Sequence, residues 1–247
     1  MKALVILPTY NEAGTIREVV AGVLASSPDA DALVVDDNSP DGTGAIADEL
    51  SAANARVTVL HRPGKGGLGP AYIAGFGEGL ARGYEALIEM DSDLSHDPAD
   101  VARLIAGATD NDLVIGSRYV PGGETRNWSP SRRKLSRAGT AYAKLFLGLP
   151  LSDATSGFRC YRRAVIEAIL MTDIRSQGYA FQIELAWRAW ILGFRLGEIP
   201  IVFTERREGA SKMSRSIVAE ALAKVLRWGL KRRRPPKAPH PKSIAAR

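Results

Sequence analysis

The chain is poor in cysteine and histidine, with one cysteine, Cys160, and three histidines in 247 residues. A single cysteine excludes an intramolecular disulfide and fits the reducing cytoplasm. Because structural zinc sites need several cysteine or histidine ligands, this composition also excludes such a site. No apolar run approaches the about 20 residues that cross a bilayer, and the N-terminal run is too short for a signal peptide. We therefore expect a soluble or peripheral protein.

Acidic residues are missing from residues 231–247, which hold seven of the 33 lysines and arginines. In residues 1–230 the other 26 basic residues nearly balance the 27 acidic ones, so the net charge of +6 comes from the C-terminal segment. This distribution argues against a uniformly basic nucleic-acid-binding domain and favours a tail that meets an anionic membrane surface. We predict a single domain over residues 1–230 and a basic, disordered tail over residues 231–247.

Apolar strand-like runs alternate with helix-like segments through the first half of the chain. The pattern predicts strands at residues 3–7, 32–35, 57–60, 87–90 and 113–115 and helices at residues 15–24, 43–50, 71–81 and 99–106. This alternation is typical of an α/β fold with a mostly parallel central sheet flanked by helices, which binds ligands beyond the carboxyl ends of its strands. The second half predicts a loop at residues 119–130, helices at residues 131–147, 163–171, 181–192 and 216–230, and one strand at residues 195–203.

Two acids, Asp91 and Asp93, follow the fourth predicted strand. Carboxylates without histidine or cysteine select a hard cation, Mg²⁺ or Mn²⁺, and Mg²⁺ is often held by one or two carboxylates and a bound diphosphate. Such a pair also occurs in many solvated turns, so its neighbours decide the interpretation. Asp37 follows a neighbouring strand, where it can accept hydrogen bonds from a base or ribose, and the glycine-rich residues 62–69 suit the close approach of an anion. The P-loop and dinucleotide-binding fingerprints are absent, which disfavours an ATPase or a dehydrogenase.

Seven short motifs follow one another along the chain: PTYNE at residues 8–12, VDDNSPDGT at 35–43, KGGLG at 65–69, MDSDLSH at 90–96, GSRY at 116–119, SGFR at 156–159 and GASKM at 209–213. In this order and spacing they resemble the catalytic domain of the dolichyl-phosphate (polyprenyl-phosphate) mannose synthases, inverting GT-A glycosyltransferases of family two. The resemblance covers roughly residues 3–230. It implies a GT-A fold with a Rossmann-like nucleotide-binding half, and transfer of mannose from GDP-mannose to a polyprenyl (dolichyl-type) monophosphate with inversion.

By this resemblance the site contains three groups of residues. The donor nucleotide is expected at Pro8, Thr9, Tyr10, Glu12, Asp37, Lys65 and Ser92. The Mg²⁺ or Mn²⁺ ion and the diphosphate are expected at Asp91 and Asp93, with Ser95 or water completing the shell; family members often have alanine in place of Ser92, and some have glutamine in place of Ser95. The acceptor phosphate is expected at Arg118, Arg133, Ser211 and Lys212, with one of Arg206 and Arg207 beside them. Surface solvation is expected instead for Arg132 and Arg137.

The sequence leaves two alternative functions open, a polyprenyl-phosphate glucosyltransferase that uses a UDP-sugar and a non-catalytic nucleotide-sugar-binding scaffold at the membrane. The helix predicted at residues 216–230 has an apolar stripe that either packs on the domain or lies in a membrane interface, beside the basic tail. We expect a cytoplasmic protein that is peripheral at the inner face of the cell membrane. This helix and the tail, or a membrane-protein partner, would hold it there.

Overall fold

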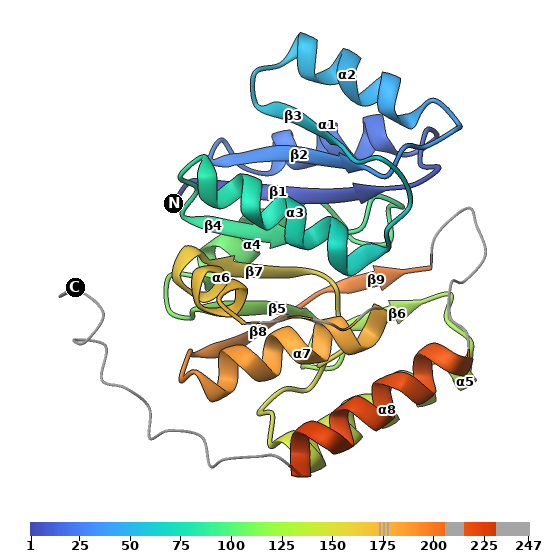
Figure 1. Cartoon of the computed structure of the whole chain (residues 1–247), viewed down its shortest axis with the longest axis vertical. Coiled ribbons are helices and arrows are strands. Elements are labelled where there is room, and N and C mark those ends of the chain that lie inside the picture. Colours follow the sequence, from blue (N-terminus) through green and yellow to red (C-terminus); the bar gives the residue numbers. More distant parts are fainter. Residues whose placement is uncertain (173, 175, 177, 206–214, 231–247) are drawn as a thin grey trace, which may run out of the picture.

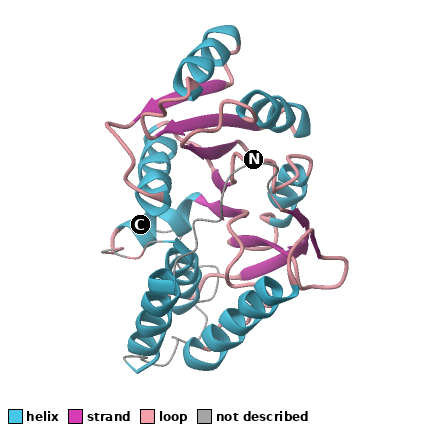
Figure 2. Cartoon of the chain, turned by 90° about the vertical axis from the view of Figure 1, so that its right-hand side faces the viewer, coloured by secondary structure: helices cyan, strands magenta, loops and turns pink. Residues whose placement is uncertain are grey.

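The structure, a computed structural model, describes residues 1–172, 174, 176, 178–205 and 215–230. A seven-stranded sheet with the order β3-β2-β1-β4-β7-β5-β8 runs through the molecule, and helices cover both of its faces (Figures 1 and 2). A second sheet pairs two short strands, β6 and β9. The strands are β1 (Ala3–Thr9), β2 (Ala30–Asp36), β3 (Val57–His61), β4 (Ala86–Glu89), β5 (Leu113–Ser117), β6 (Glu124–Arg126), β7 (Arg159–Arg162), β8 (Leu196–Pro200) and β9 (Val202–Thr204). The helices are α1 (Ile16–Ser26), α2 (Thr43–Ala53), α3 (Leu68–Ala81), α4 (Asp100–Gly107), α5 (Pro130–Leu147), α6 (Arg163–Leu170), α7 (Gly178–Ile191) and α8 (Arg215–Leu230).

Strand β1 shows why the first half of the sheet reads as continuous apolar runs. Leu4 and Ile6 enter the core layer that contains α3 and α7, whereas Ala3, Val5 and Leu7 enter the layer that contains α1 and α4. All five side chains are fully buried. A strand covered on both faces needs apolar residues at every position rather than at alternate ones. The prediction of an α/β fold with a mostly parallel sheet is confirmed, because β1 to β4 pair in parallel and β5 pairs in parallel with β8.

The second half of the chain differs from the prediction in three places. Strand β7, which was not predicted, lies antiparallel between β4 and β5. The predicted loop at residues 119–130 contains the three-residue strand β6. The single strand predicted at residues 195–203 is wrong, since β8 pairs with β5 and β9 pairs with β6. The predicted strand is interrupted between Pro200, which has no N–H to donate, and Val202. Between them, the Ile201 N–H donates to the Ser117 carbonyl, and the Ile201 carbonyl accepts from the Glu124 N–H.

The terminal helix α8 packs on α5 and α7 (Figure 1). Trp228 stacks on Trp187 of α7 with ring centres 5.5 Å apart, and Val225 is fully buried. Ala221 and Val225 of its apolar stripe therefore pack on the domain, whereas Leu222, Leu226 and Leu230 are exposed, so the described part of the stripe does not decide between the two alternatives predicted. Within the described residues, no helix has both the length and the apolar character needed to span a bilayer. The division into a domain of residues 1–230 and a basic tail stays a prediction, and residues 231–247 lie outside the described residues.

Candidate active site

The carboxyl ends of β1, β2, β3 and β4 meet at one edge of the sheet because these strands are parallel. The register places Thr9 beside Asp36 and Asp36 beside His61. Thr9 Oγ1 and Ser39 Oγ both donate to Asp36 Oδ1, at 3.1 and 2.5 Å. The polar turns that the sequence assigned to separate strand ends therefore lie together, and the buried Asp36 carboxylate joins the first two of them.

Three of these turns contain a residue in the left-handed region, with φ of 63° at Asn11, 58° at Asn38 and 61° at Leu94. Asparagine adopts this conformation fairly readily, but leucine seldom does. Leu94 directly follows Asp93, so the backbone is strained beside the acid pair. Strain of this kind concentrates at functional sites, where the surrounding structure has to maintain it. This observation supports the edge of the sheet as the candidate site.

Asp37 joins the turn after β2 to the glycine-rich loop. Arg62 Nη1 donates to Asp37 Oδ1 at 2.6 Å, and the N–H of Gly66 donates to Oδ2 at 3.0 Å. On the same side, Lys65 Nζ lies 4.1 Å from the centre of the Tyr10 ring. The structure thus brings together Asp37, Lys65 and Tyr10, three residues predicted for the donor nucleotide. It also gives Asp37 a role that the sequence did not reveal, since both of its carboxylate oxygens hold the loop at residues 62–66.

The acid pair follows β4, where alternation turns Ser92 inward. Ser92 is buried and its hydroxyl donates to the Pro8 carbonyl at 2.9 Å. Its own carbonyl accepts from Thr15 Oγ1 at 2.7 Å, so Ser92 fastens the end of β4 to the end of β1. The predicted contact of Ser92 with the nucleotide has to compete with this structural role. Asp91 is one-third exposed, and Asp93 Oδ1 accepts from the N–H of Ser95 at 3.1 Å. Glu12, also predicted for the nucleotide, donates its N–H to Thr43 Oγ1 at 2.9 Å.

The donor set fits a hard divalent cation. Asp91 and Asp93 supply only oxygen atoms. Among the described residues, no histidine, cysteine, aspartate or glutamate joins them as a third metal ligand. Mg²⁺ is usually held by one or two carboxylates plus phosphates of a substrate, so a pair suffices. The hydroxyl of Ser95 is buried and has no hydrogen-bond partner within the described part of the chain. Burial and then the charge of Asp91 raise the pKa of Tyr72 well above its usual value, which is consistent with a concentration of negative charge here.

Two buried groups flank the acid pair. Burial raises the pKa of Glu89 to about 7, against the opposing effect of the Arg159 guanidinium. Burial lowers the pKa of His96 to about 4, so its imidazole is neutral near pH 7. His96 Nδ1 accepts the N–H of Asp91 at 3.3 Å, and its ring stacks on Phe158 at 4.8 Å. These contacts make His96 a structural support of the acid-pair turn.

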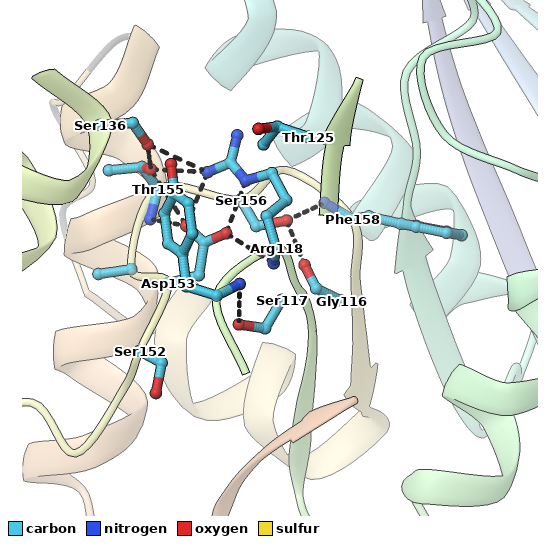
Figure 3. A network of polar contacts seen from close by, with 12 residues as sticks. Gly116, Ser117, Arg118, Thr125, Ser136, Ser152, Asp153, Thr155, Ser156 and Phe158 are labelled. Atoms are coloured by element: carbon cyan, nitrogen blue, oxygen red, sulfur yellow. Dashed lines mark hydrogen bonds and ion pairs between the residues drawn. The ribbon is translucent and has the colours of Figure 1, made fainter. Parts of the chain in front are cut away.

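Arg118, at the end of β5, lies in a buried polar network (Figure 3). Its Nε and Nη2 donate to Asp153 Oδ2 and Oδ1 at 2.6 and 2.7 Å, and Nη2 donates to Thr155 Oγ1 at 2.8 Å. Burial alone would raise the pKa of Asp153, but the Arg118 guanidinium and its hydrogen bonds hold that pKa below the usual value. The sequence identified Arg118 and missed Asp153. The signal that was available is that a buried arginine needs a carboxylate, and Asp153 stands in a segment of small residues, DATSG.

The other basic side chains considered in the sequence analysis lie at exposed or half-buried positions, or outside the described residues. Arg133, on α5, is exposed and donates from Nε to Thr125 Oγ1 at 3.0 Å. Arg132 was expected to be solvated, but this is wrong, because it pairs with Glu205 at 2.6 Å and lies 4.3 Å from the Trp128 ring centre. Arg137 is exposed as expected and lies over Tyr119. The predicted residues Arg206, Arg207, Ser211 and Lys212 lie outside the described residues.

Phe203 of β9 connects the acid-pair side to the Arg118 side. Its ring centre lies 5.1 Å from that of His96 and 5.5 Å from the Arg118 guanidinium carbon. The neighbouring Thr204 donates its N–H to the Ser95 carbonyl at 3.1 Å. The Phe203 ring therefore contacts both Arg118 and His96, and His96 in turn accepts the Asp91 N–H of the acid-pair turn. This arrangement suits a reaction between two anionic substrates, one held by a cation and the other by basic side chains.

The chain matches the family model of glycosyl transferase family 2 over residues 4–170. It is 52% identical over 237 residues to the polyprenol monophosphomannose synthase of Mycolicibacterium smegmatis, a match that covers 94% of this chain and 88% of that protein. It is 50% identical over 230 residues to the undecaprenyl-phosphate mannosyltransferase of Micrococcus luteus, a match that covers 93% of this chain and 95% of that protein.

Solved structures with the same fold are more distant in sequence. Glucosyl-3-phosphoglycerate synthase from Mycobacterium tuberculosis, solved with phosphoglyceric acid, has a TM-score of 0.65 at 19% identity and covers 91% of this chain and 80% of its own. The mannosyltransferase PcManGT from Pyrobaculum calidifontis, solved with GDP-Man and Mn²⁺, has a TM-score of 0.61 at 17% identity. The match covers 95% of this chain and 66% of that one. At this identity the likeness concerns the fold, and the predicted GT-A type of α/β fold is confirmed.

Proposed function

The chain belongs to glycosyl transferase family 2, and we propose that it transfers mannose from GDP-mannose to a polyprenyl monophosphate with inversion. The observation that carries this proposal is that Phe203 contacts both the Arg118–Asp153 network and His96, which accepts the N–H of Asp91 in the acid-pair turn. Two relatives that are about 50% identical to this chain support the substrate class. One is named a polyprenol monophosphomannose synthase and the other an undecaprenyl-phosphate mannosyltransferase.

The donor side would bind the nucleotide sugar. Pro8, Thr9, Tyr10, Glu12, Asp37, Lys65 and Ser92 are the residues proposed to surround the nucleotide. Asp91 and Asp93 would hold Mg²⁺ or Mn²⁺, with Ser95 or water beside them, and the Mn²⁺ of the Pyrobaculum mannosyltransferase supports a divalent ion in this fold. When bound, such an ion supplies Lewis-acid neutralisation of the departing diphosphate.

The acceptor side would orient the lipid phosphate. A phosphate monoester has a second pKa of roughly 6, so it is already a dianion near pH 7 and needs no strong general base. Its oxygen can attack the anomeric carbon from the face opposite the diphosphate, and a single displacement of this kind inverts that carbon. Because Asp153 offsets the charge of Arg118, Arg118 would orient the phosphate chiefly by hydrogen bonding. Further positive charge would come from Arg133, from Arg206 or Arg207, and from Lys212, and the hydroxyl of Ser211 would add a hydrogen bond.

Donor competition tests the sugar assignment. Purified protein with Mn²⁺ or Mg²⁺ and a short polyprenyl phosphate is given labelled GDP-mannose with unlabelled UDP-glucose in excess, and then the reverse pair. We expect label in the lipid product only from GDP-mannose. Labelled lipid from UDP-glucose alone would establish the alternative, a polyprenyl-phosphate glucosyltransferase. Binding of either nucleotide sugar without any labelled lipid would establish the non-catalytic scaffold.

The membrane position is a further part of the proposal. We propose a cytoplasmic enzyme, peripheral at the inner face of the membrane, that contacts anionic lipid through α8 and the basic residues 231–247 or through a membrane-protein partner. Each basic residue near an anionic surface contributes about 1 kcal/mol of attraction. A chain that ends at residue 230 should therefore sediment less with anionic vesicles but keep its activity on a short, soluble acceptor. Equal sedimentation of both chains would contradict a role for the tail.

A further inference from the structure

A cavity of about 290 Å³ lies along α5, and its residues take no part in the proposed reaction. Its walls include three residues of α5, Arg137, Thr140 and Lys144, together with Tyr119 and Ser152. The three α5 residues share one face of the helix, since residues three and four apart are neighbours there. Another face of α5 packs on α8, where the Tyr142 hydroxyl donates to a carbonyl of that helix at 3.3 Å. The cavity is therefore separate from the contact between α5 and α8.

The cavity and the Arg118 network share a wall. Tyr119 follows Arg118, and its ring centre lies 5.4 Å from the Arg118 guanidinium carbon and 5.0 Å from that of Arg137. Ser152 precedes Asp153, and Figure 3 shows the Ser152 side chain pointing away from the network around Arg118. Neighbouring residues of the same two segments thus serve two different places, the buried network and the open cavity.

The walls of the cavity are positively charged. Arg137 and Lys144 are exposed, and neither pairs with a carboxylate among the residues that the structure describes. None of the side chains that line the cavity in the described part of the chain is acidic. The Glu198 carboxylate is close by, but it accepts the N–H groups of Ser152 and Asp153 at 2.8 and 2.9 Å. Two cations without counterions beside a cavity favour an anionic ligand.

Two hydroxyls in the walls lack a partner. Thr140 is 6% exposed, and neither its Oγ1 atom nor the Tyr119 Oη atom has a hydrogen-bond partner within the described residues. A threonine inside a helix can bond the carbonyl of residue i−4, and Thr140 does not. A buried hydroxyl without a partner costs free energy, which a ligand with acceptor oxygens recovers. Two cations and several hydroxyls together match the oxygens of a phosphate group.

We propose that this cavity binds a phosphate group that is distinct from the acceptor phosphate at Arg118. Arg137 and Lys144 neutralise its charge, and the hydroxyls of Tyr119, Thr140 and Ser152 donate to its oxygens. Two sources supply such a group, the headgroup of an anionic phospholipid and a free phosphate anion. The inference does not depend on the proposed function, because none of these residues belongs to the proposed donor or acceptor side.

The test follows phosphate binding at individual residues of the full chain. Inorganic phosphate is titrated into ¹⁵N-labelled protein, and the amide signals of Ala141 and Ser152 report on the cavity. The Trp128 indole signal reports on the acceptor side, since its ring centre lies 5.0 Å from the Arg118 guanidinium carbon. Sedimentation with vesicles of phosphatidylglycerol and phosphatidylcholine, compared with phosphatidylcholine alone, tests the headgroup as the source.

Four variants separate a built site from diffuse surface charge. Arg137→Gln and Lys144→Gln each remove one charge, and Thr140→Val removes the buried hydroxyl while it keeps the shape of the side chain. Lys134→Gln is the matched control, because Lys134 is an exposed lysine of the same helix that does not line the cavity. Melting temperatures verify that all four variants fold.

We expect phosphate to shift the Ala141 and Ser152 signals. Arg137→Gln and Lys144→Gln should each weaken this binding by about fivefold or more, and Thr140→Val by about threefold. Lys134→Gln should change it by less than about twofold, and the response of Trp128 should be the same in all variants. If a headgroup is the source, Arg137→Gln, Lys144→Gln and Thr140→Val also sediment less with phosphatidylglycerol vesicles than Lys134→Gln does. If a free anion is the source, all four variants sediment equally.

Three results would overturn the proposal. One is a Thr140→Val variant that behaves as the wild type in both measurements, because charge without the buried hydroxyl is not a built site. The second is a Lys134→Gln variant that loses as much binding as Arg137→Gln, which would mean that the whole surface of α5 attracts anions. The third is a phosphate titration that shifts the Trp128 signal alone, together with equal sedimentation of all variants, because the acceptor side would then hold the bound phosphate.

Discussion

The candidate site contains two arginine–aspartate pairs, and they differ in how far water reaches them. On the proposed donor side the side chains of Arg62 and Asp37 are 16% and 7% exposed, whereas on the proposed acceptor side those of Arg118 and Asp153 are 4% and 0% exposed. The first pair joins two turns at the surface, and the second lies against the rings of Trp128 and Phe203. The free-energy cost of leaving an ion unpaired rises with its burial. Loss of the Asp153 carboxylate should therefore destabilise the fold more than loss of the Asp37 carboxylate.

The donor pair shapes a loop that a ligand can reach, so its loss should mainly affect binding. The acceptor pair fixes an arginine inside the fold, so its loss should mainly affect stability. Asp153→Asn, its pH dependence and Asp37→Asn test this contrast, and Asp93→Ala tests the acid pair on which the proposed donor side depends.

The largest effect is expected from Asp93→Ala. If the acid pair holds the divalent ion, this substitution removes one of two carboxylate ligands and with it several kcal/mol of transition-state stabilisation. We expect mannose transfer to fall at least about a thousandfold, since each 1.36 kcal/mol is a factor of ten. The melting temperature should change little, because the change also removes one of two neighbouring negative charges. Mn²⁺ binding measured by electron paramagnetic resonance should weaken in parallel. Asp110→Ala, at an exposed acid outside the site, is the matched control, and near-normal turnover of Asp93→Ala would refute the metal role.

Asp153→Asn should cause the largest loss of stability. It leaves the buried Arg118 guanidinium without its carboxylate, which costs about 3 kcal/mol or more of the free energy of unfolding. Urea unfolding monitored by circular dichroism measures this loss. Glu167→Gln is the control, because its pair with Arg163 on helix α6 is well exposed and should contribute less than about 1 kcal/mol. Similar losses in the two variants would mean that burial does not distinguish these pairs.

The contribution of Asp153 should also depend on pH in the acid range. Its pKa is lowered in the folded protein from the usual 3.8, so the folded state releases this proton more readily than the unfolded state. The stabilisation is then fully present above the usual value and is lost as the pH falls through the lowered one. We expect the stability difference between wild type and Asp153→Asn to stay constant from about pH 7 to about pH 5 and to shrink below about pH 4. A difference that shrinks between pH 7 and pH 5 would contradict a lowered pKa.

The donor side was largely predictable from the sequence, because it is built from local patterns. Each of β1, β2 and β4 is an apolar run followed at once by a polar turn, and the parallel order of an α/β sheet brings such turns to one edge. The order of apolar runs and polar turns along the chain was therefore enough to place Asp37, Asp91 and Asp93 at the same edge of the sheet. The detailed partners were not predictable, since nothing local shows that Asp37 binds Arg62 or that Ser92 points inward to Pro8.

The acceptor side was less predictable because it depends on contacts between distant segments. Strand β7 was not predicted because it contains the charged residue Arg159, which is unusual in a buried strand. The Arg159 guanidinium is nevertheless fully buried, and it donates to the carbonyls of Ala154, Ser156 and Gln182. Asp153 precedes it in a loop of small residues that has no periodicity. The pairing of Asp153 with Arg118 becomes visible only once β7 is inserted antiparallel between β4 and β5.

Of the two arginine–aspartate pairs, the less buried one should lose less stability when it is broken by Asp37→Asn. Asparagine can still accept the N–H of Gly66 but loses the charge that holds Arg62, so we expect a loss of about 1 kcal/mol in the free energy of unfolding. The loop at residues 62–66 would then be less well positioned for the nucleotide, and KM for GDP-mannose should rise by about tenfold while kcat changes less. Asp48→Asn, at an exposed acid beside His61, is the control and should change neither value. If Asp37→Asn destabilised the protein as much as Asp153→Asn, both pairs would be structural. A large fall in kcat with an unchanged KM would instead assign Asp37 to the transition state rather than to the shape of the donor loop.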